Sequence, residues 1–308
     1  MINRVLIRIR VVQILFACFE SKETDLKKAE NELLFSLQKS YDLYHYLLSL
    51  FIELTDLYQH RIDNRKAKLL PTEEDVNPNT RLTDNRFVSQ LRKNKTLQKY
   101  LTDRPFHWND NDTFLRTTLD AILASDIYKE YLDDANDSYD TDREFWRKVL
   151  KNIITQTEDL FNFLEDESLY WNDDIDIVVS FVLKTIKRFD PQNGEEQELL
   201  PMFRDDTDRE FAVKLLHYTL LNAGEYQELV DKYTKNWESE RIASMDMVIM
   251  QIAIAEIMNF VSIPTSVTLN EYINIAKAYS TTKSASFING ILDAIVKELK
   301  SEQKIFKQ

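Results

Sequence analysis

Three arginines near the start of the chain are the residues best suited to binding chemistry. Arg4, Arg8 and Arg10 all precede the first acidic residue, Glu20. An arginine fork can donate two parallel hydrogen bonds to a phosphate. In a helix, Arg4 and Arg8 share one face, whereas Arg10 and Gln13 share another. Two interpretations stay open: a phosphate-binding surface, or arginines that only keep the N-terminus soluble.

Residue types that often carry catalysis form no recognisable motif elsewhere in the sequence. The four histidines lack the spacing of metal ligands and are expected to be isolated surface or core residues: His45, His60, His107 and His217. The aspartates of residues 133–142 lack the glycine and glutamate of a calcium loop, which favours solvated turns. Cys18 lies in an apolar run, which favours a place in the core. We therefore expect no catalytic residue, metal or cofactor, and no enzyme activity.

Composition narrows the fold class and the compartment. The chain has 308 residues, 44% of them hydrophobic, with only three glycines and six prolines. Glycine-rich phosphate loops and β-hairpin arrays need more glycine, so an all-α fold is predicted. A net charge of −13 repels polyanions and restricts any nucleic-acid contact to a local surface. One cysteine, an N-terminus interrupted by arginines and no long uncharged apolar run indicate a cytoplasmic protein without a membrane contact.

Apolar residues that repeat at the helical period predict the helices that position the candidate residues. Residues 243–261 are apolar on nearly every face, as expected of a central core helix. Thr268 and Glu271 have the spacing of a capping box, and Ser284 is a plausible N-cap for residues 284–299. The remaining helices are expected over residues 26–60, 84–100, 112–132, 142–164, 168–188 and 206–229, the last with a break or C-cap at Gly224. Polar turns are expected over residues 71–84, 133–142 and 190–198.

Segments at the two ends of the chain together resemble the NusB family of all-helical transcription antitermination factors. At the N-terminus, Arg4 matches the family's arginine-rich arm. The family's first helix is matched by four residues in the same order: Arg8, Gln13, Leu15 and Phe16. The C-terminal resemblance begins with the central apolar helix, Met245 to Met258, and the loop after it, Ile263 to Val267. It continues through two signatures: Asn270, Glu271, Ala276 and Lys277, then Phe287, Asn289, Gly290, Leu292 and Asp293.

The resemblance implies binding of boxA-type RNA together with NusE, the small-subunit ribosomal protein that pairs with the family, within a transcription elongation complex. It implies these RNA-binding residues: Arg4, Arg8, Arg10, Gln13, Phe287, Asn289 and Gly290. Phe287 could stack on a base or belong to the core, and Gly290 could admit a ligand or a neighbouring helix. The family is often basic at positions that here hold Val5, Leu6, Ile7 and Ser286.

The same resemblance predicts the domain organisation. Residues 1–21 and 206–300 are expected to form a NusB-like helical bundle, residues 22–205 an inserted helical subdomain, and residues 301–308 a tail. The acidic loops of the insertion would repel RNA, so the insertion is expected to serve protein contacts, and Arg8 is expected to lie near Phe287. Two alternatives stay open: a NusB-like protein-interaction module without RNA binding, and a remnant of an RNA methyltransferase, which would need a glycine-rich cofactor domain.

Overall fold

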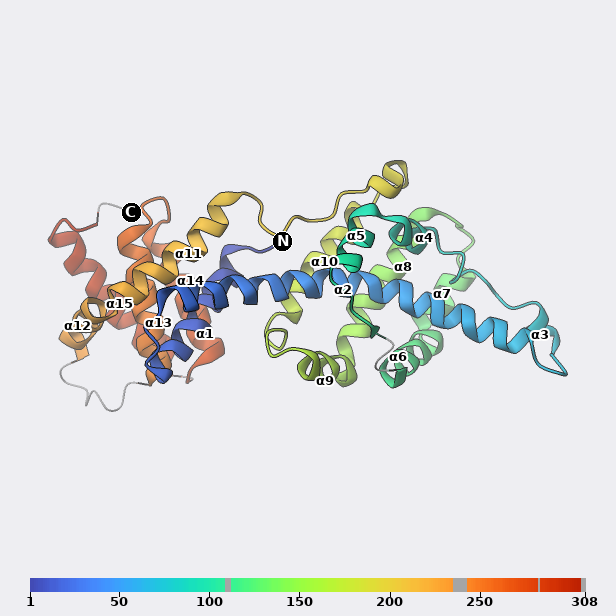
Figure 1. The fold of residues 1–308 in the computed structure, drawn as a ribbon, viewed down its shortest axis with the longest axis horizontal. Helices are drawn as coiled ribbons and strands as arrows, with labels where there is room; N and C mark the ends of the chain where they lie inside the picture. The colour runs from blue at the N-terminus through green and yellow to red at the C-terminus, as the bar shows by residue number, and fades with distance from the viewer. Residues whose placement is uncertain (109–111, 235–242, 282, 306–308) are drawn as a thin grey trace. The chain divides into compact units, whose positions relative to one another are not determined.

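The computed structural model describes residues 1–108, 112–234, 243–281 and 283–305, and these residues are predominantly helical (Figure 1). The described part contains no strand beyond an isolated parallel bridge between Ile2 and Phe203. The predicted all-α fold is therefore confirmed. None of the helices in the described part combines the length and the apolar content that crossing a bilayer requires.

The chain divides into two compact units. The terminal unit comprises Ile2–Leu37 and Phe203–Gln308, and the middle unit comprises Met1 and Gln38–Met202. Helix α2 (Leu26–Lys66) contributes its first part to the terminal unit and the rest to the middle unit. The first part of α2 thus groups with the terminal helices, although the sequence interpretation placed it in the insertion.

The terminal unit is built around α13 (Ser244–Asn259). This helix packs against α1 (Arg4–Ser21) and four others: α11 (Asp206–Leu221), α12 (Ala223–Thr234), α14 (Thr265–Tyr279) and α15 (Ser284–Ser301). Every residue from Val248 to Ile257 is buried, which explains the apolar composition on all faces of α13. The prediction of a central core helix is confirmed.

The middle unit has a core of its own. Its helices are the remainder of α2, α3 (Glu73–Val76), α4 (Arg86–Lys93), α5 (Lys95–Asp103), α6 (Asp112–Ala124), α7 (Asp126–Asp133), α8 (Tyr139–Asn152), α9 (Glu158–Glu167) and α10 (Ile175–Arg188), with short 3-10 helices at Ile154–Gln156 and Pro191–Glu196. Helix α8 packs against α4, α7 and α10. The ring of Trp146 lies 5.2 Å from that of Phe51, and both side chains are fully buried. Aromatic packing of this kind contributes strongly to a helical core.

Several predicted helices are interrupted in the structure. Residues 84–100 form α4 and α5, because the side chain of Asn94 accepts a hydrogen bond from Leu97 N and begins a new helix. Ser125 separates α6 from α7 in the same way, through Tyr128 N. The predicted helix over residues 142–164 ends at Asn152, and α9 begins only at Glu158. The apolar period continues across each break, which is why spacing alone did not reveal them.

Two predicted caps and the predicted tail of the terminal unit require correction. Helix α14 begins at Thr265, after Pro264, so Thr268 lies inside the helix and does not form a capping box with Glu271. The break after α11 falls at Asn222, and Gly224 lies in the first turn of α12. The predicted tail from residue 301 begins within α15, and Ile305 is buried; residues 306–308 lie outside the described part.

Candidate nucleic-acid interface

Helix α1 carries the three N-terminal arginines and is anchored firmly to the terminal unit. Its first turn is capped by Asn3, whose side chain accepts a hydrogen bond of 2.9 Å from Leu6 N. It packs against α11 and α13 through buried apolar side chains, which include Leu6, Ile7, Val11 and Leu15. Because so much of α1 is buried, the three arginines meet very different surroundings.

Arg8 lies inside the terminal unit. Its Nε and Nη2 each donate a hydrogen bond of 2.8 Å to the carboxylate of Glu256 on α13, and the two side chains are 4% and 0% exposed. Burial acts to lower the pKa of Arg8, but the hydrogen bonds and negative charge of Glu256 outweigh it and raise that pKa. The guanidinium therefore faces a protein carboxylate and not the solvent that an RNA would occupy.

Glu256 is held by further donors. The hydroxyl of Thr268 donates a hydrogen bond of 2.8 Å to Glu256, and the hydroxyl of Tyr272 donates one of 3.0 Å. Sequence reasoning missed this network of Arg8, Glu256, Thr268 and Tyr272, although a signal was present. Glu256 is the sole acid in the apolar run 247–258, and a buried charge in such a run requires a partner.

Arg10 and Arg4 differ in their exposure. Arg10 is buried, and its Nη1 donates a hydrogen bond of 2.8 Å to the half-buried side chain of Gln13, three residues later. The side chain of Arg4 is 39% exposed, with Nε 3.2 Å from a carboxylate oxygen of Asp208. Its guanidinium also lies 5.0 Å from the ring centroid of Phe211. Arg4 thus offers the most accessible of the three guanidinium groups.

The second set of predicted residues lies on α15. Phe287 and Asn289 are half-buried and Gly290 is exposed, while Ile288 between them is fully buried. A Cβ atom added to Gly290 would meet no other atom within 4 Å. Gly290 therefore does not serve close helix packing in this structure, and its side of α15 is open to an approaching ligand.

The start of α15 is already occupied by a negative charge. The buried carboxylate of Asp246 on α13 accepts hydrogen bonds from the hydroxyls of Ser280 and Ser284, the latter at 2.8 Å. A carboxylate at a helix N-terminus favours the helix and opposes a second anion there. A phosphate that approached the first amides of α15 would therefore compete with a carboxylate of the protein itself.

Arg8 and Phe287 belong to helices that share neighbours. Arg8 contacts Glu256 on α13 and lies 3.8 Å from Glu271 on α14, while α15, which carries Phe287, packs against both helices. The expected proximity of Arg8 and Phe287 stays a prediction, but Arg8 is buried and does not share an exposed surface with Phe287. The sequence motifs predicted that the N-terminal and C-terminal segments of the chain form one bundle, and both segments belong to the terminal unit.

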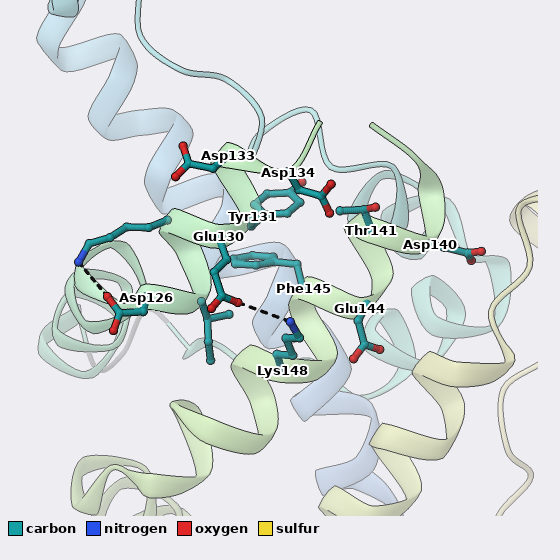
Figure 2. A pocket seen from close by; sticks show the side chains of 12 residues that line it. Asp126, Glu130, Tyr131, Asp133, Asp134, Asp140, Thr141, Glu144, Phe145 and Lys148 are labelled. Atoms are coloured by element: carbon teal, nitrogen blue, oxygen red, sulfur yellow. Dashed lines mark hydrogen bonds and ion pairs between the residues drawn. The ribbon is translucent and has the colours of Figure 1, made fainter. Parts of the chain in front are cut away.

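The acidic residues after position 125 gather around a pocket in the middle unit. This pocket, of about 760 Å³, lies between α7 and α8. Figure 2 shows the side chains that line it, which include the carboxylates of Asp126, Glu130 and Glu144. Two of these carboxylates pair with lysines, at 3.0 Å for Lys129 with Asp126 and 3.7 Å for Lys148 with Glu130. No cluster of three metal-ligating side chains occurs in the described ranges.

Comparisons with known proteins converge on a single family. The model of the NusB family matches residues 185–297. The transcription antitermination protein NusB of Salinibacter ruber is 34% identical over 132 residues, which cover 41% of this chain and 82% of that protein. The protein of the same name from Thermodesulfovibrio yellowstonii is 38% identical over 119 residues, covering 39% and 74%. A solved structure of T. maritima NusB is 26% identical, with a TM-score of 0.30, and the match covers 53% of this chain and 95% of that one.

Proposed function

Because this chain belongs to the NusB family, we propose that it is a transcription antitermination factor that binds boxA-type RNA together with NusE. The proposal places it in the transcription elongation complex in the cytoplasm. It requires no catalytic residue, metal or cofactor from the chain. The terminal unit is the proposed NusB-like RNA-binding domain, and the middle unit is the proposed helical insertion.

The observation that carries the RNA-binding proposal is the open face of α15 around Gly290. Phe287 and Asn289 flank this face as partly exposed side chains, so one can stack on an unpaired base and the other can hydrogen-bond to a base edge or a phosphate. Arg4 adds an accessible guanidinium at the start of α1. The proposed RNA contacts are therefore Arg4, Phe287, Asn289 and Gly290.

The buried arginines have a different proposed role. Arg8 fixes α1 to α13 through Glu256, and Arg10 holds Gln13 on the same helix. Both act on RNA only by positioning α1, and with it Arg4. The burial of two of the three arginines also supports a second candidate function, a NusB-like protein-interaction module that does not bind RNA.

A transcription assay tests the proposed function. Elongation complexes are assembled on a template that carries boxA upstream of a terminator, with NusE and either this protein or none. We expect added protein to increase readthrough on the boxA template and not on a template with scrambled boxA. Equal readthrough on the two templates would contradict the proposal and favour the interaction module.

A further inference from the structure

Two helices of the middle unit carry positive charge that the sequence interpretation overlooked. Residues 145–157, in α8 and just beyond it, hold Arg147, Lys148 and Lys151 and no acid. Residues 177–189, in α10 and just beyond it, hold Lys184, Lys187 and Arg188 and no acid. Two such stretches are unexpected in a chain whose net charge is −13. The N-terminal arginines are therefore not the only concentration of positive charge.

The two stretches lie side by side. Helices α8 and α10 pack against each other, and the side chain of Arg143, near the start of α8, reaches the end of α10. Its Nη1 donates hydrogen bonds of 3.3 Å to Lys187 O and 2.7 Å to Phe189 O. The beginning of α8 thus lies beside the end of α10, and helices packed along their length in this way run antiparallel.

Lys151, Lys184, Lys187 and Arg188 are exposed, and the side chains of Arg143 and Arg147 are 27% and 25% exposed. Apolar side chains such as Val149 and Val182 fill the inner faces and are fully buried. Arg143, Arg147 and Lys151 follow one another at four-residue intervals and form one row along α8. On α10, residues 184, 187 and 188 are all exposed. We name these six side chains the basic ridge: Arg143, Arg147, Lys151, Lys184, Lys187 and Arg188.

Few carboxylates neutralise the basic ridge. Glu144 accepts a hydrogen bond of 2.6 Å from Arg147 and also experiences the charges of Lys148 and Lys187, which together lower its pKa. Arg143 pairs at 2.9 Å with the exposed carboxylate of Asp140. The other four cations of the ridge form no ion pair with any residue in the described ranges.

Other lysines of the same unit provide a contrast. Lys68 pairs with Asp75 at 2.9 Å, and Lys129 pairs with Asp126 at 3.0 Å. Lys95 pairs with two acids of the segment after α10, Glu195 and Glu196. These three lysines are neutralised locally, whereas Lys66, Lys93 and Lys99 form no ion pair in the described ranges. What distinguishes the basic ridge is that its unpaired cations gather on two packed helices.

We propose that the basic ridge binds the phosphate backbone of RNA that flanks the boxA segment. The proposal rests on the proposed function, because it requires that the chain bind RNA. Cations in a row contact phosphates without reading bases, so the ridge is expected to add affinity and not sequence preference. The eight residue steps from Arg143 to Lys151 span about 12 Å of helix, a length comparable with three or four phosphates of a stacked strand.

The test compares two triple variants of the full chain in the presence of NusE. The ridge variant is Lys151→Gln, Lys184→Gln and Lys187→Gln. The matched control is Lys68→Gln, Lys95→Gln and Lys129→Gln, which removes the same charge from paired lysines of the same unit. Each protein is titrated, over a range of salt concentrations, with boxA RNA alone and with boxA RNA extended by roughly 20 nucleotides.

With the extended RNA, we expect the ridge variant to lose about two units of the log-log salt slope relative to the wild type, since each single-strand phosphate contact contributes about 0.7. With boxA alone, both variants should match the wild type. An unchanged slope for the ridge variant on the extended RNA overturns the inference while leaving the proposed function intact. Absence of binding by the wild type to either RNA overturns the proposed function itself.

Discussion

The guanidinium of Arg8 and the carboxylate of Glu256 form two parallel hydrogen bonds of 2.8 Å inside the terminal unit. The bonds join α1, at the start of the chain, to α13, far along the sequence. If either side chain were removed, the charge of the other would remain buried without a partner or solvent. Each of the two side chains can therefore be buried only with the other present. The ion pair with Glu256 explains why an arginine occurs in the apolar helix α1, and this explanation requires no contact between Arg8 and RNA.

Replacement of Arg8 by alanine should destabilise the terminal unit strongly. We expect a loss of about 3–5 kcal/mol in the free energy of unfolding, because Glu256 would remain buried without its cation. Urea denaturation followed by circular dichroism measures the change. Arg4→Ala is the matched control, and its cost should stay within about 1 kcal/mol because Arg4 is partly exposed. Equal costs for the two variants would contradict the structural role of Arg8.

Phe287→Ala should weaken RNA binding with little effect on folding. A base stacked on the ring contributes about 1–3 kcal/mol of affinity, and the half-buried ring contributes only part of a core phenylalanine's stability. The neighbouring variant Ile288→Ala should do the reverse, since Ile288 is fully buried and its truncation costs about 2–5 kcal/mol. Thermal denaturation beside RNA titration distinguishes the two. A Phe287→Ala protein that unfolds as easily as Ile288→Ala would assign the ring to the core.

Stability of the middle unit should decrease in mild acid because of His45. Burial lowers the pKa of this fully enclosed imidazole to about 4, from an ordinary value of 6.5. Between these two values the unfolded chain binds more protons than the folded one, so stability is complete above pH 6.5 and declines as the pH falls toward 4. The imidazole accounts for about 3 kcal/mol of that decline.

The variant His45→Phe isolates this contribution, because phenylalanine can keep the stacking that His45 makes with Tyr100 at 3.5 Å between ring centroids. Urea denaturation at several pH values, followed by tryptophan fluorescence, reports on the unit through Trp108, Trp146 and Trp171. We expect a flatter dependence on pH in the variant between pH 6.5 and 4. Parallel curves for both proteins would show that folding does not lower the pKa of His45.

Asn94→Ala should destabilise the middle unit by about 2 kcal/mol. The buried Asn94 side chain accepts a hydrogen bond from Leu97 N and donates one of 2.7 Å to the carbonyl of Gln197, so its loss leaves both groups unpaired. Denaturation with urea gives the cost, with Asn152→Ala as an exposed control. A cost no larger than that of the control would remove Asn94 as the cause of the break between α4 and α5.

The terminal helices were predictable because their apolar residues repeat cleanly and lie on packed faces. Helix α15 illustrates this, since Ile288, Leu292, Ile295 and Leu299 are all fully buried as the period indicates. The breaks at Asn94 and Ser125 in the middle unit were not predictable from spacing, because a single capping side chain interrupts a helix without disturbing the apolar period. Local hydrogen bonding decided those boundaries.

The candidate site was predictable only in part. Motif spacing predicted Phe287, Asn289 and Gly290 as RNA-binding residues, and the three lie together on one partly exposed turn. It did not separate Arg4 from Arg8, because charge pattern alone cannot show which arginine faces a buried carboxylate. The basic ridge was hidden because its two halves are far apart in sequence and the acidic loops between them dominate the local charge.

Equilibrium titration of boxA RNA and of scrambled RNA with the full chain, with and without NusE, tests the proposed RNA binding most directly. We expect preferential binding of boxA RNA, tighter binding when NusE is present, and a salt slope that Arg4→Ala reduces by about 0.7, the value of one lost single-strand phosphate contact. Equal affinity for boxA and scrambled RNA, both with and without NusE, would contradict the account.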